Sequence, residues 1–289
     1  MSDPSQSDLV SSFTQPAVPV GEPALEPTVS NENYHPGEPP QRRHYSEWDP
    51  RSAPGTYFLL AINVAVFVWM ILHGVSPTRP EIPQLLHYGA NNPSMVLGGQ
   101  WWRLVTATFV HIGMIHIATN MWCLWNLGLL GEPLLGPLGL IAVYLITGVA
   151  GNLLSIAWDL IFRSQIQLIV GVGAGASGAV FGIAGILIIL LSNRRLPIPW
   201  TELKRLRTAV VRFAAINLVI GASTIVFNAG IRIDNSAHIG GFLSGLALGP
   251  GLVPYMTRGR AAYLGHQKIV FLAAAFILTL VGYWLANFK

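Results

Sequence analysis

The sequence predicts an all-α fold: a multi-pass bundle of transmembrane helices. Only 10% of the 289 residues are charged, 52% are hydrophobic, and long apolar runs recur along the chain. Soluble domains carry about 25% charged residues, so this composition argues against a water-soluble globular enzyme. Only helices satisfy their own backbone hydrogen bonds in lipid at the length of these runs, which makes a helical membrane protein the default expectation.

The charges divide the chain into two parts. Residues 1–51 hold 8 of the 13 acidic and 3 of the 17 basic residues, and the remainder holds 5 acidic and 14 basic residues. The first part is rich in Pro, Ser and Glu without apolar periodicity, so we expect residues 1–52 to form a disordered cytosolic tail. The basic residues of the second part stand at the ends of apolar runs, where membrane topology explains them, and we expect no nucleic-acid partner.

Seven apolar runs predict seven membrane-spanning helices. The first six form a core over residues 53–256, and residues 257–289 hold a cytosolic linker and the seventh span. Of the Lys and Arg residues near the span ends, eleven fall on one side and five on the other, which predicts a cytosolic N-terminus and a C-terminus on the opposite side. The expected spans are residues 56–73, 114–130, 138–158, 177–192, 209–227, 238–254 and 269–288.

The N-terminal residues and the cysteine count bear on cellular location and on disulfide or zinc sites. The polar, acidic start has neither the basic region of a secretory signal nor the arginines of a transit peptide, so we expect the cell membrane. The single cysteine, Cys123, allows no internal disulfide and no cysteine-based zinc site.

The fourth expected span is unusually short. Its 16 residues make a helix of about 24 Å, against a hydrocarbon core of about 30 Å. A glycine-rich segment, residues 171–176, precedes it. Non-helical backbone at membrane depth is tolerated where it lines a water-filled cavity, so we expect a recessed, wet pocket above Ser177.

The segment between the first two spans, residues 74–113, is too long for a simple connector. It contains Trp101, Trp102 and Arg103, residue types that suit the membrane interface. We therefore expect it to fold back against the outer leaflet, with His111 as an interfacial residue that supports it.

Polar side chains inside membrane spans are costly and call for an explanation. His116 and Asn120 lie four residues apart on one face of the second span, Ser177 begins the fourth, and His238 begins the sixth. These three spans run in the same direction, so the polar groups reach a similar depth in the outer half of the membrane.

Glycines favour close contact between the fourth and sixth spans. Gly178 and Gly182 on the fourth span, and Gly241 and Gly245 on the sixth, have the spacing of small-residue helix packing. Such contact would bring the serine hydroxyl and the histidine imidazole together.

A serine beside an imidazole is the minimum for an activated nucleophile. We expect no Asp or Glu near these positions, so the site would be a Ser177–His238 dyad. The Ser177 N–H at the helix start, His116 and Asn120 are candidate donors to an oxyanion. Phe181, one turn after Ser177, either fills the core or stacks under the His238 ring.

The order of these residues resembles the rhomboid intramembrane serine proteases, over about residues 56–255. The seventh span resembles that family's six-plus-one arrangement of helices. The matching motifs are His116-x-x-x-Asn120, Gly175-Ala176-Ser177-Gly178 and Ala237-His238-x-x-Gly241-x-x-x-Gly245, together with Trp102-Arg103 and Glu132.

The resemblance implies hydrolysis of peptide bonds in or near transmembrane segments of other membrane proteins, within the lipid bilayer and without metal or cofactor. It makes Ser177 the nucleophile and His238 the general base, with His116, Asn120 and the Ser177 N–H as the oxyanion hole. It also implies a substrate-binding loop at Ala174 and Gly175 and supporting roles for Trp102, Arg103, Phe181, Gly241 and Gly245.

Two other classes of protein could use the same polar residues. One is a non-proteolytic membrane protein that binds transmembrane clients; the presence of both Ser177 and His238 argues against it. The other is a transporter or metal-binding protein that uses His111, His116 and His238. Its spans would be expected to carry carboxylates or a His-x-x-x-His pair, and neither is present.

Overall fold

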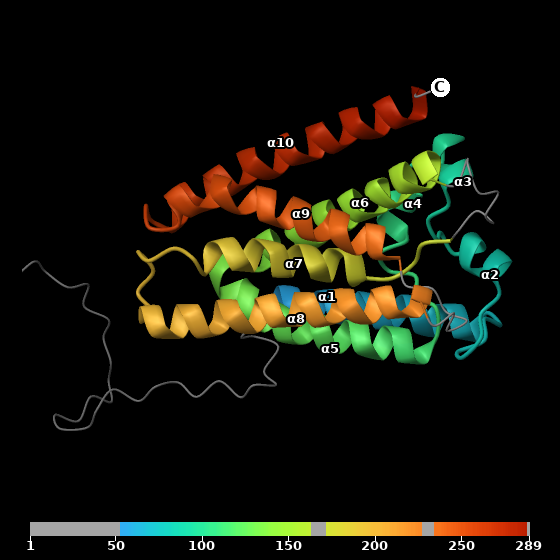
Figure 1. Ribbon diagram of the computed structural model, residues 1–289, viewed down its shortest axis with the longest axis horizontal. Coiled ribbons are helices and arrows are strands. Elements are labelled where there is room, and N and C mark those ends of the chain that lie inside the picture. Colours follow the sequence, from blue (N-terminus) through green and yellow to red (C-terminus); the bar gives the residue numbers. More distant parts are fainter. Residues whose placement is uncertain (1–52, 163–171, 227–233, 288–289) are drawn as a thin grey trace, which may run out of the picture. The chain divides into compact units, whose positions relative to one another are not determined.

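The computed structural model describes residues 53–162, 172–226 and 234–287. In this part of the chain every regular element is a helix (Figure 1). The expected tail, residues 1–52, lies outside the described residues. Each of the seven expected spans coincides with a helix: α1 Pro54–Leu72, α5 Met114–Leu135, α6 Pro137–Phe162, α7 Ser177–Leu190, α8 Trp200–Val226, α9 Asn235–Leu252 and α10 Arg260–Asn287.

The lengths of these helices fit a membrane-embedded bundle. Among the described residues, four helical stretches are long and apolar enough to cross a membrane: α1, α6, α10, and α9 with the 3₁₀ turn that follows it. Helix α7 is apolar but has only 14 residues, about 21 Å. The expected short fourth helix is therefore confirmed, and it is shorter than the sequence suggested.

Two helices begin about nine residues before their expected apolar spans. Helix α8 starts at Trp200 and α10 at Arg260, and both first turns contain charged or polar residues. Apolar content detects only the part of a helix that lipid covers. The added residues include Leu, Lys, Arg and Ala, which are good helix formers and extend each helix beyond that part.

Helix α7 lies in the middle of the bundle, with α9 on one side and α8, α1 and α5 on the other (Figure 1). It packs most extensively against α9 and α6, and 11 of its 14 residues are buried. A helix that is apolar all round must be covered on every side by protein or lipid, and protein covers most of α7. Helix α10 runs along α6 and α9 and is mostly exposed, as expected of a helix that faces lipid.

Three short helices occupy the segment between α1 and α5: α2 Ile82–His87, α3 Pro93–Leu97 and α4 Arg103–Thr106. The Arg103 side chain is 5% exposed and ties them together. Its guanidinium donates to the carbonyls of Leu86 (2.7 Å) and Ala90 (3.0 Å) and to Gln100 Oε1 (2.7 Å), and it lies 4.6 Å from the ring centre of the half-exposed Trp102.

A buried carboxylate from α5 caps the start of α1. Glu132 accepts hydrogen bonds from the N–H groups of Gly55 (2.8 Å) and Thr56 (2.7 Å) and from Thr56 Oγ1 (2.7 Å). These N–H groups have no partner within their own helix, and the N-cap residue Ala53 offers no side-chain acceptor. The negative charge also lies at the positive end of the helix dipole, so the contact joins α1 firmly to α5.

Replacing Glu132 with Gln is expected to lower the free energy of unfolding by about 2–3 kcal/mol. The amide has one acceptor oxygen instead of two, and its NH₂ group would face buried donors. Chemical denaturation in mild detergent measures the change. Glu202→Gln is the control: Glu202 is 39% exposed and paired with Arg205, and its loss is expected to cost about 0–1 kcal/mol. Equal losses in both variants would contradict a specific role for the cap.

Candidate active site

The backbone before Ser177 is anchored to the segment between α1 and α5. Gly173 and Asn91 exchange two backbone hydrogen bonds, of 2.7 and 3.0 Å, and the Gly175 N–H donates to the carbonyl of Ala107 at 2.9 Å. These bonds hold the backbone at Gly173 and Gly175 in place just before the first turn of α7. Ser177 is half-buried at that turn, and the pocket expected above it stays a prediction.

Gly175 brings this backbone against the ring of His116. Its φ angle is +128°, and a Cβ atom at this position would lie 2.6 Å from His116 Cε1. Both the conformation and the space require glycine. The His116 ring therefore lies directly beside the chain two residues before Ser177.

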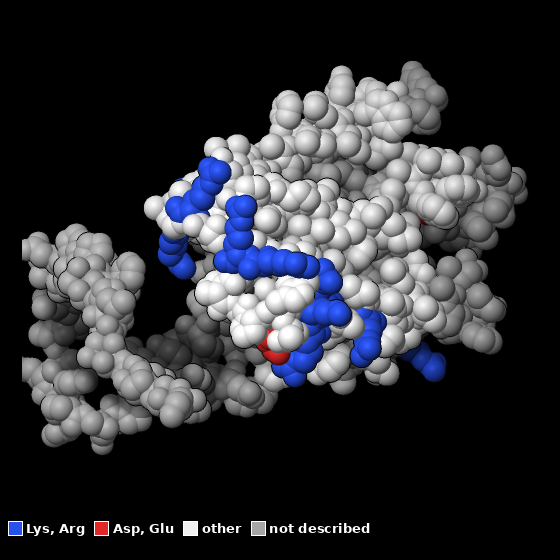
Figure 2. Space-filling view, turned by 60° about the vertical axis from the view of Figure 1, so that its left-hand side comes forward, with Lys and Arg blue, Asp and Glu red and all other residues white. Residues whose placement is uncertain are grey.

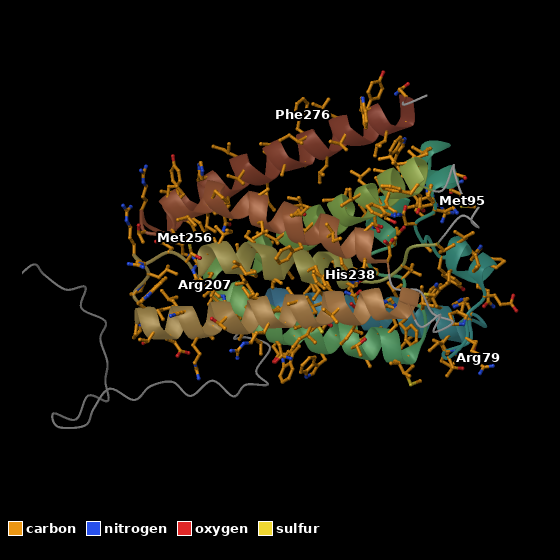
Figure 3. All side chains as sticks on the ribbon, viewed as in Figure 1. Arg79, Met95, Arg207, His238, Met256 and Phe276 are labelled. Carbon is orange, nitrogen blue, oxygen red and sulfur yellow. The ribbon has the colours of Figure 1, made fainter. Side chains whose placement is uncertain are left out.

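His238 faces α7 from the first turn of α9. Its side chain is 6% exposed, and its ring stacks on that of Phe181 with centroids 4.4 Å apart and planes 17° apart. Because Phe181 is one turn after Ser177 on α7, the His238 ring lies about one helical turn from Ser177, at the interface between α7 and α9. Figure 3 shows His238 well removed from Arg207 and Met256 at the other end of the bundle.

The histidine ring has unused hydrogen-bonding capacity. Its Nδ1 is buried and has no partner among the described residues, and within that part of the chain no hydrogen bond joins it to Ser177. Buried polar atoms are normally satisfied, so an exception calls for an explanation. Catalytic hydrogen bonds are often long without substrate and tighten when it binds.

Glycine pairs set the distance between α7 and α9. A Cβ atom on Gly241 would overlap the carbonyl oxygen of Gly178, and one on Gly245 would overlap that of Gly182. The two backbones are therefore in direct contact, as the spacing predicted. This contact is what allows the His238 ring to reach Phe181.

His116 and Asn120 both project from the first two turns of α5. Asn120 Nδ2 donates to the carbonyl of His116 at 2.9 Å, which leaves its second N–H available. His116 Nδ1 accepts the N–H of Ile112 at 3.3 Å, so the neutral ring carries its proton on Nε2. Both side chains can therefore present an N–H donor.

A carboxylate does lie next to the histidine, and the expectation of none was wrong. Asp234 is the N-cap of α9, which begins three residues before the expected span. Its Oδ1 accepts from Ala237 N (3.1 Å) and Ser236 Oγ (2.5 Å), and its Oδ2 from Ser155 Oγ (2.5 Å) on α6. Among the described residues no hydrogen bond joins this carboxylate to the imidazole, although the two groups interact electrostatically. The hydrogen bonds of Asp234 therefore fix the start of α9.

The structure also differs from the prediction for His111. It was expected at the interface, but it is 0% exposed. Its Nδ1 donates to the carbonyl of Phe109 at 3.1 Å, and its Nε2 accepts the N–H of Ala176 at 3.3 Å. His111 thus holds the residue before Ser177 in place. Its apolar neighbours, Val110 and Ile112, were the available sign that it is buried.

Comparison with known proteins gives these residues a common context. The family model of the Rhomboid domain matches residues 98–255, more than half of the chain. The rhomboid protease AarA of Providencia stuartii is 31% identical over 218 residues, which cover 70% of this chain and 74% of AarA. The chain belongs to the rhomboid family. The family and the membrane-embedded helical fold predicted from the sequence are thereby confirmed.

Other rhomboid relatives differ in length. The rhomboid protease GluP of Bacillus subtilis (strain 168) is 34% identical over 191 residues, 66% of this chain, and the chain spans only 33% of GluP. Rhomboid-like protease 2 of Toxoplasma gondii is 29% identical over 191 residues, 65% of this chain and 62% of its own length. The matched Rhomboid domain contains Ser177, His238, His116 and Asn120, and α10 lies outside it.

The position of Asp234 raises the question of a third catalytic member in this rhomboid chain. Asp234→Asn is expected to keep activity within about tenfold, because Asn is as good an N-cap as Asp. A base-orienting carboxylate replaced by its amide costs about 10⁴-fold in kcat, so a loss of that size would contradict our assignment. Asp234→Ala, which removes the cap, is expected to lower the free energy of unfolding by about 1–2 kcal/mol. Proteolysis rates and denaturation in detergent measure both.

In the described part of the rhomboid chain, no group of three or more His, Cys, Asp or Glu side chains is placed to hold a metal ion.

Proposed function

We propose that the chain is an intramembrane serine endopeptidase that cuts peptide bonds in or near transmembrane segments of membrane proteins. The observation that carries this proposal is the stacking of His238 on Phe181, 4.4 Å apart, one turn from Ser177 at the start of a buried helix. The relatives GluP and AarA, both named rhomboid proteases, support it. The same proposal places the protein in the cell membrane with its N-terminus in the cytosol.

In this mechanism Ser177 Oγ attacks the carbonyl carbon of the scissile bond while His238 accepts the hydroxyl proton. The tetrahedral oxyanion receives hydrogen bonds from the Ser177 N–H, His116 Nε2–H and Asn120 Nδ2–H. His238 then gives its proton to the leaving amine as the C–N bond breaks. His238 then accepts a proton from water as the water attacks the acyl ester, and hydrolysis of the ester restores the serine.

Helix geometry supports the role of Ser177. The first turn of a helix leaves N–H groups without partners within that helix, and the helix dipole adds positive potential there. The site itself is held on packed helices: α7 against α9 through glycine pairs, and the preceding backbone through Asn91 and His111. Such preorganised donors stabilise charge without rearranging during the reaction.

The oxyanion role of Asn120 can be tested by truncation. Asn120→Ala is expected to lower kcat by about 10²–10³-fold with little change in KM, because the lost donor acts in the transition state. Asn126→Ala is a matched control: Asn126 also donates to the carbonyl four residues earlier on α5, at 2.7 Å, but it is exposed. An effect that appears in KM, or equally in the control, would contradict the assignment.

The proposed function is tested with the purified full-length chain in liposomes that also hold a single-span membrane protein tagged at both ends. The expected result is two fragments whose masses place the cut in or near the transmembrane segment. Recovery of the intact single-span protein bound to the chain would instead favour the non-proteolytic, client-binding alternative. Several single-span proteins with different residues near the membrane surface should be included.

A further inference from the structure

Basic side chains gather at the end of the bundle opposite the site. Figure 2 shows Lys and Arg concentrated on this end, the left-hand end of Figure 1. Residues 194–212 contain six basic residues and one acidic residue, Glu202, which is paired with Arg205 at 2.6 Å. We call the following residues the basic cluster: Arg194, Arg195, Lys204, Arg205, Arg207, Arg212, Arg258 and Arg260.

Three of these guanidiniums lie over aromatic rings. Arg194 and Arg207 lie 4.4 and 5.6 Å from the ring centre of Trp200, and Arg258 lies 4.7 Å from that of Tyr255. Stacking on a ring leaves the charge and most of the in-plane N–H donors free for an anion. Of these donors, Arg207 Nη1 is engaged by Ser192 Oγ at 3.1 Å.

The two segments of the basic cluster are joined. Asn193 Nδ2 donates to Met256 Sδ at 3.7 Å, which links the α7–α8 connection to the segment between α9 and α10. Beside this link the surface is hollowed by a cavity of about 220 Å³, whose lining includes Leu196, Met256 and Arg260. Of the basic cluster, Arg260 lines this recess, and most of the other lining residues are apolar.

The cluster stands where lipid headgroups begin. Beyond Arg212 the large exposed side chains of α8 are apolar, among them Ile216 and Val219, and these suit contact with hydrocarbon. A helix that turns from exposed apolar residues to exposed basic ones crosses from the acyl region into the headgroup region. Clusters of four to eight Lys and Arg in this position attract anionic lipids.

We propose that the basic cluster binds the phosphates of anionic phospholipid headgroups, with Arg194 and Arg207 on Trp200 as its most ordered part. Positive charges near the ends of membrane spans set the orientation of the protein, and this role requires no particular side-chain geometry. The aromatic platforms, the Asn193–Met256 link and the adjacent recess favour a defined binding site. This inference is independent of the proposed proteolysis.

The test is native mass spectrometry of the full-length chain, delipidated in detergent and titrated with phosphatidylglycerol or phosphatidylcholine. We expect tighter binding of phosphatidylglycerol, with its affinity reduced about fivefold for each arginine lost in Arg194→Gln/Arg207→Gln and phosphatidylcholine binding unchanged. Arg79→Gln, an exposed arginine at the other end of the molecule (Figure 3), is expected to change neither.

Three results would overturn the proposal: equal affinity for the two lipids, an equal effect of Arg79→Gln, or full displacement of phosphatidylglycerol by inorganic phosphate. The last would assign the site to a soluble phosphate. Trp200→Leu provides a second variant that keeps every charge. It is expected to weaken phosphatidylglycerol binding while leaving elution from size-exclusion chromatography unchanged, and unchanged binding would mean that the ring does not order the site.

Discussion

Ser177→Ala is expected to lower the cleavage rate by on the order of 10⁴-fold or more, to the background of the assay. The hydroxyl is the atom that forms the covalent bond, and no neighbouring group can replace it. His238→Ala is expected to lose a similar amount, and the double variant no more than either single one, because nucleophile and base act as a unit. Rates with a single-span substrate in liposomes measure all three.

Ser244→Ala is the matched control for these variants. Ser244 is also on α9, where its hydroxyl donates to the carbonyl of Gly241 at 2.8 Å, and we expect its loss to leave the rate nearly unchanged. Additive losses in the Ser177 and His238 double variant would mean that the two residues do not act in one step.

Gly245→Ala is expected to have the second largest effect, because α7 and α9 touch through their backbones. The added methyl group would overlap the carbonyl oxygen of Gly182, which cannot move without its helix. Overpacking of this kind costs about 1–3 kcal/mol in the free energy of unfolding. A shift of about 1 Å between the helices is expected to cost about 10²-fold in rate, since reacting groups must be aligned.

Gly265→Ala is the control for the glycine contact. Gly265 is helical, on α10, and has no atom within 4 Å of the position where a Cβ would stand. Alanine there is expected to be neutral or to stabilise by about 1 kcal/mol through helix propensity. Wild-type activity of Gly245→Ala would contradict the close contact of α7 and α9.

Much of the fold can be predicted from the sequence because helices that contact lipid must be mostly apolar. Apolar runs located seven of the helices but not the short α2, α3 and α4, and the short α7 followed from length alone. The starts of α8 and α10 did not, because helix formation continues past the apolar residues into charged ones. Hydropathy predicts only the part of a helix that contacts lipid. The helix itself continues as far as its backbone hydrogen bonds do, which can be well beyond that part.

The site was predictable where chemistry and spacing agree, and less so where it depends on packing. Ser177, His238 and the glycine pairs followed from residue type and order, and their catalytic roles stay predictions until measured. The carboxylate of Asp234 was missed because it precedes the apolar run and acts as a helix cap. The apolar neighbours of His111 were the only local sign of its burial, and its partner, the backbone of Ala176, is distant in sequence.

The proposed pairing of Ser177 with His238 is tested most directly by reacting the purified chain with a fluorophosphonate, which bonds to an activated serine with loss of fluoride. Peptide mass spectrometry then locates the adduct. We expect a single adduct, on Ser177, which is absent in His238→Ala and after heat denaturation. An adduct on another serine, or equal labelling of Ser177 in His238→Ala, would contradict the claim that these two residues form an activated pair.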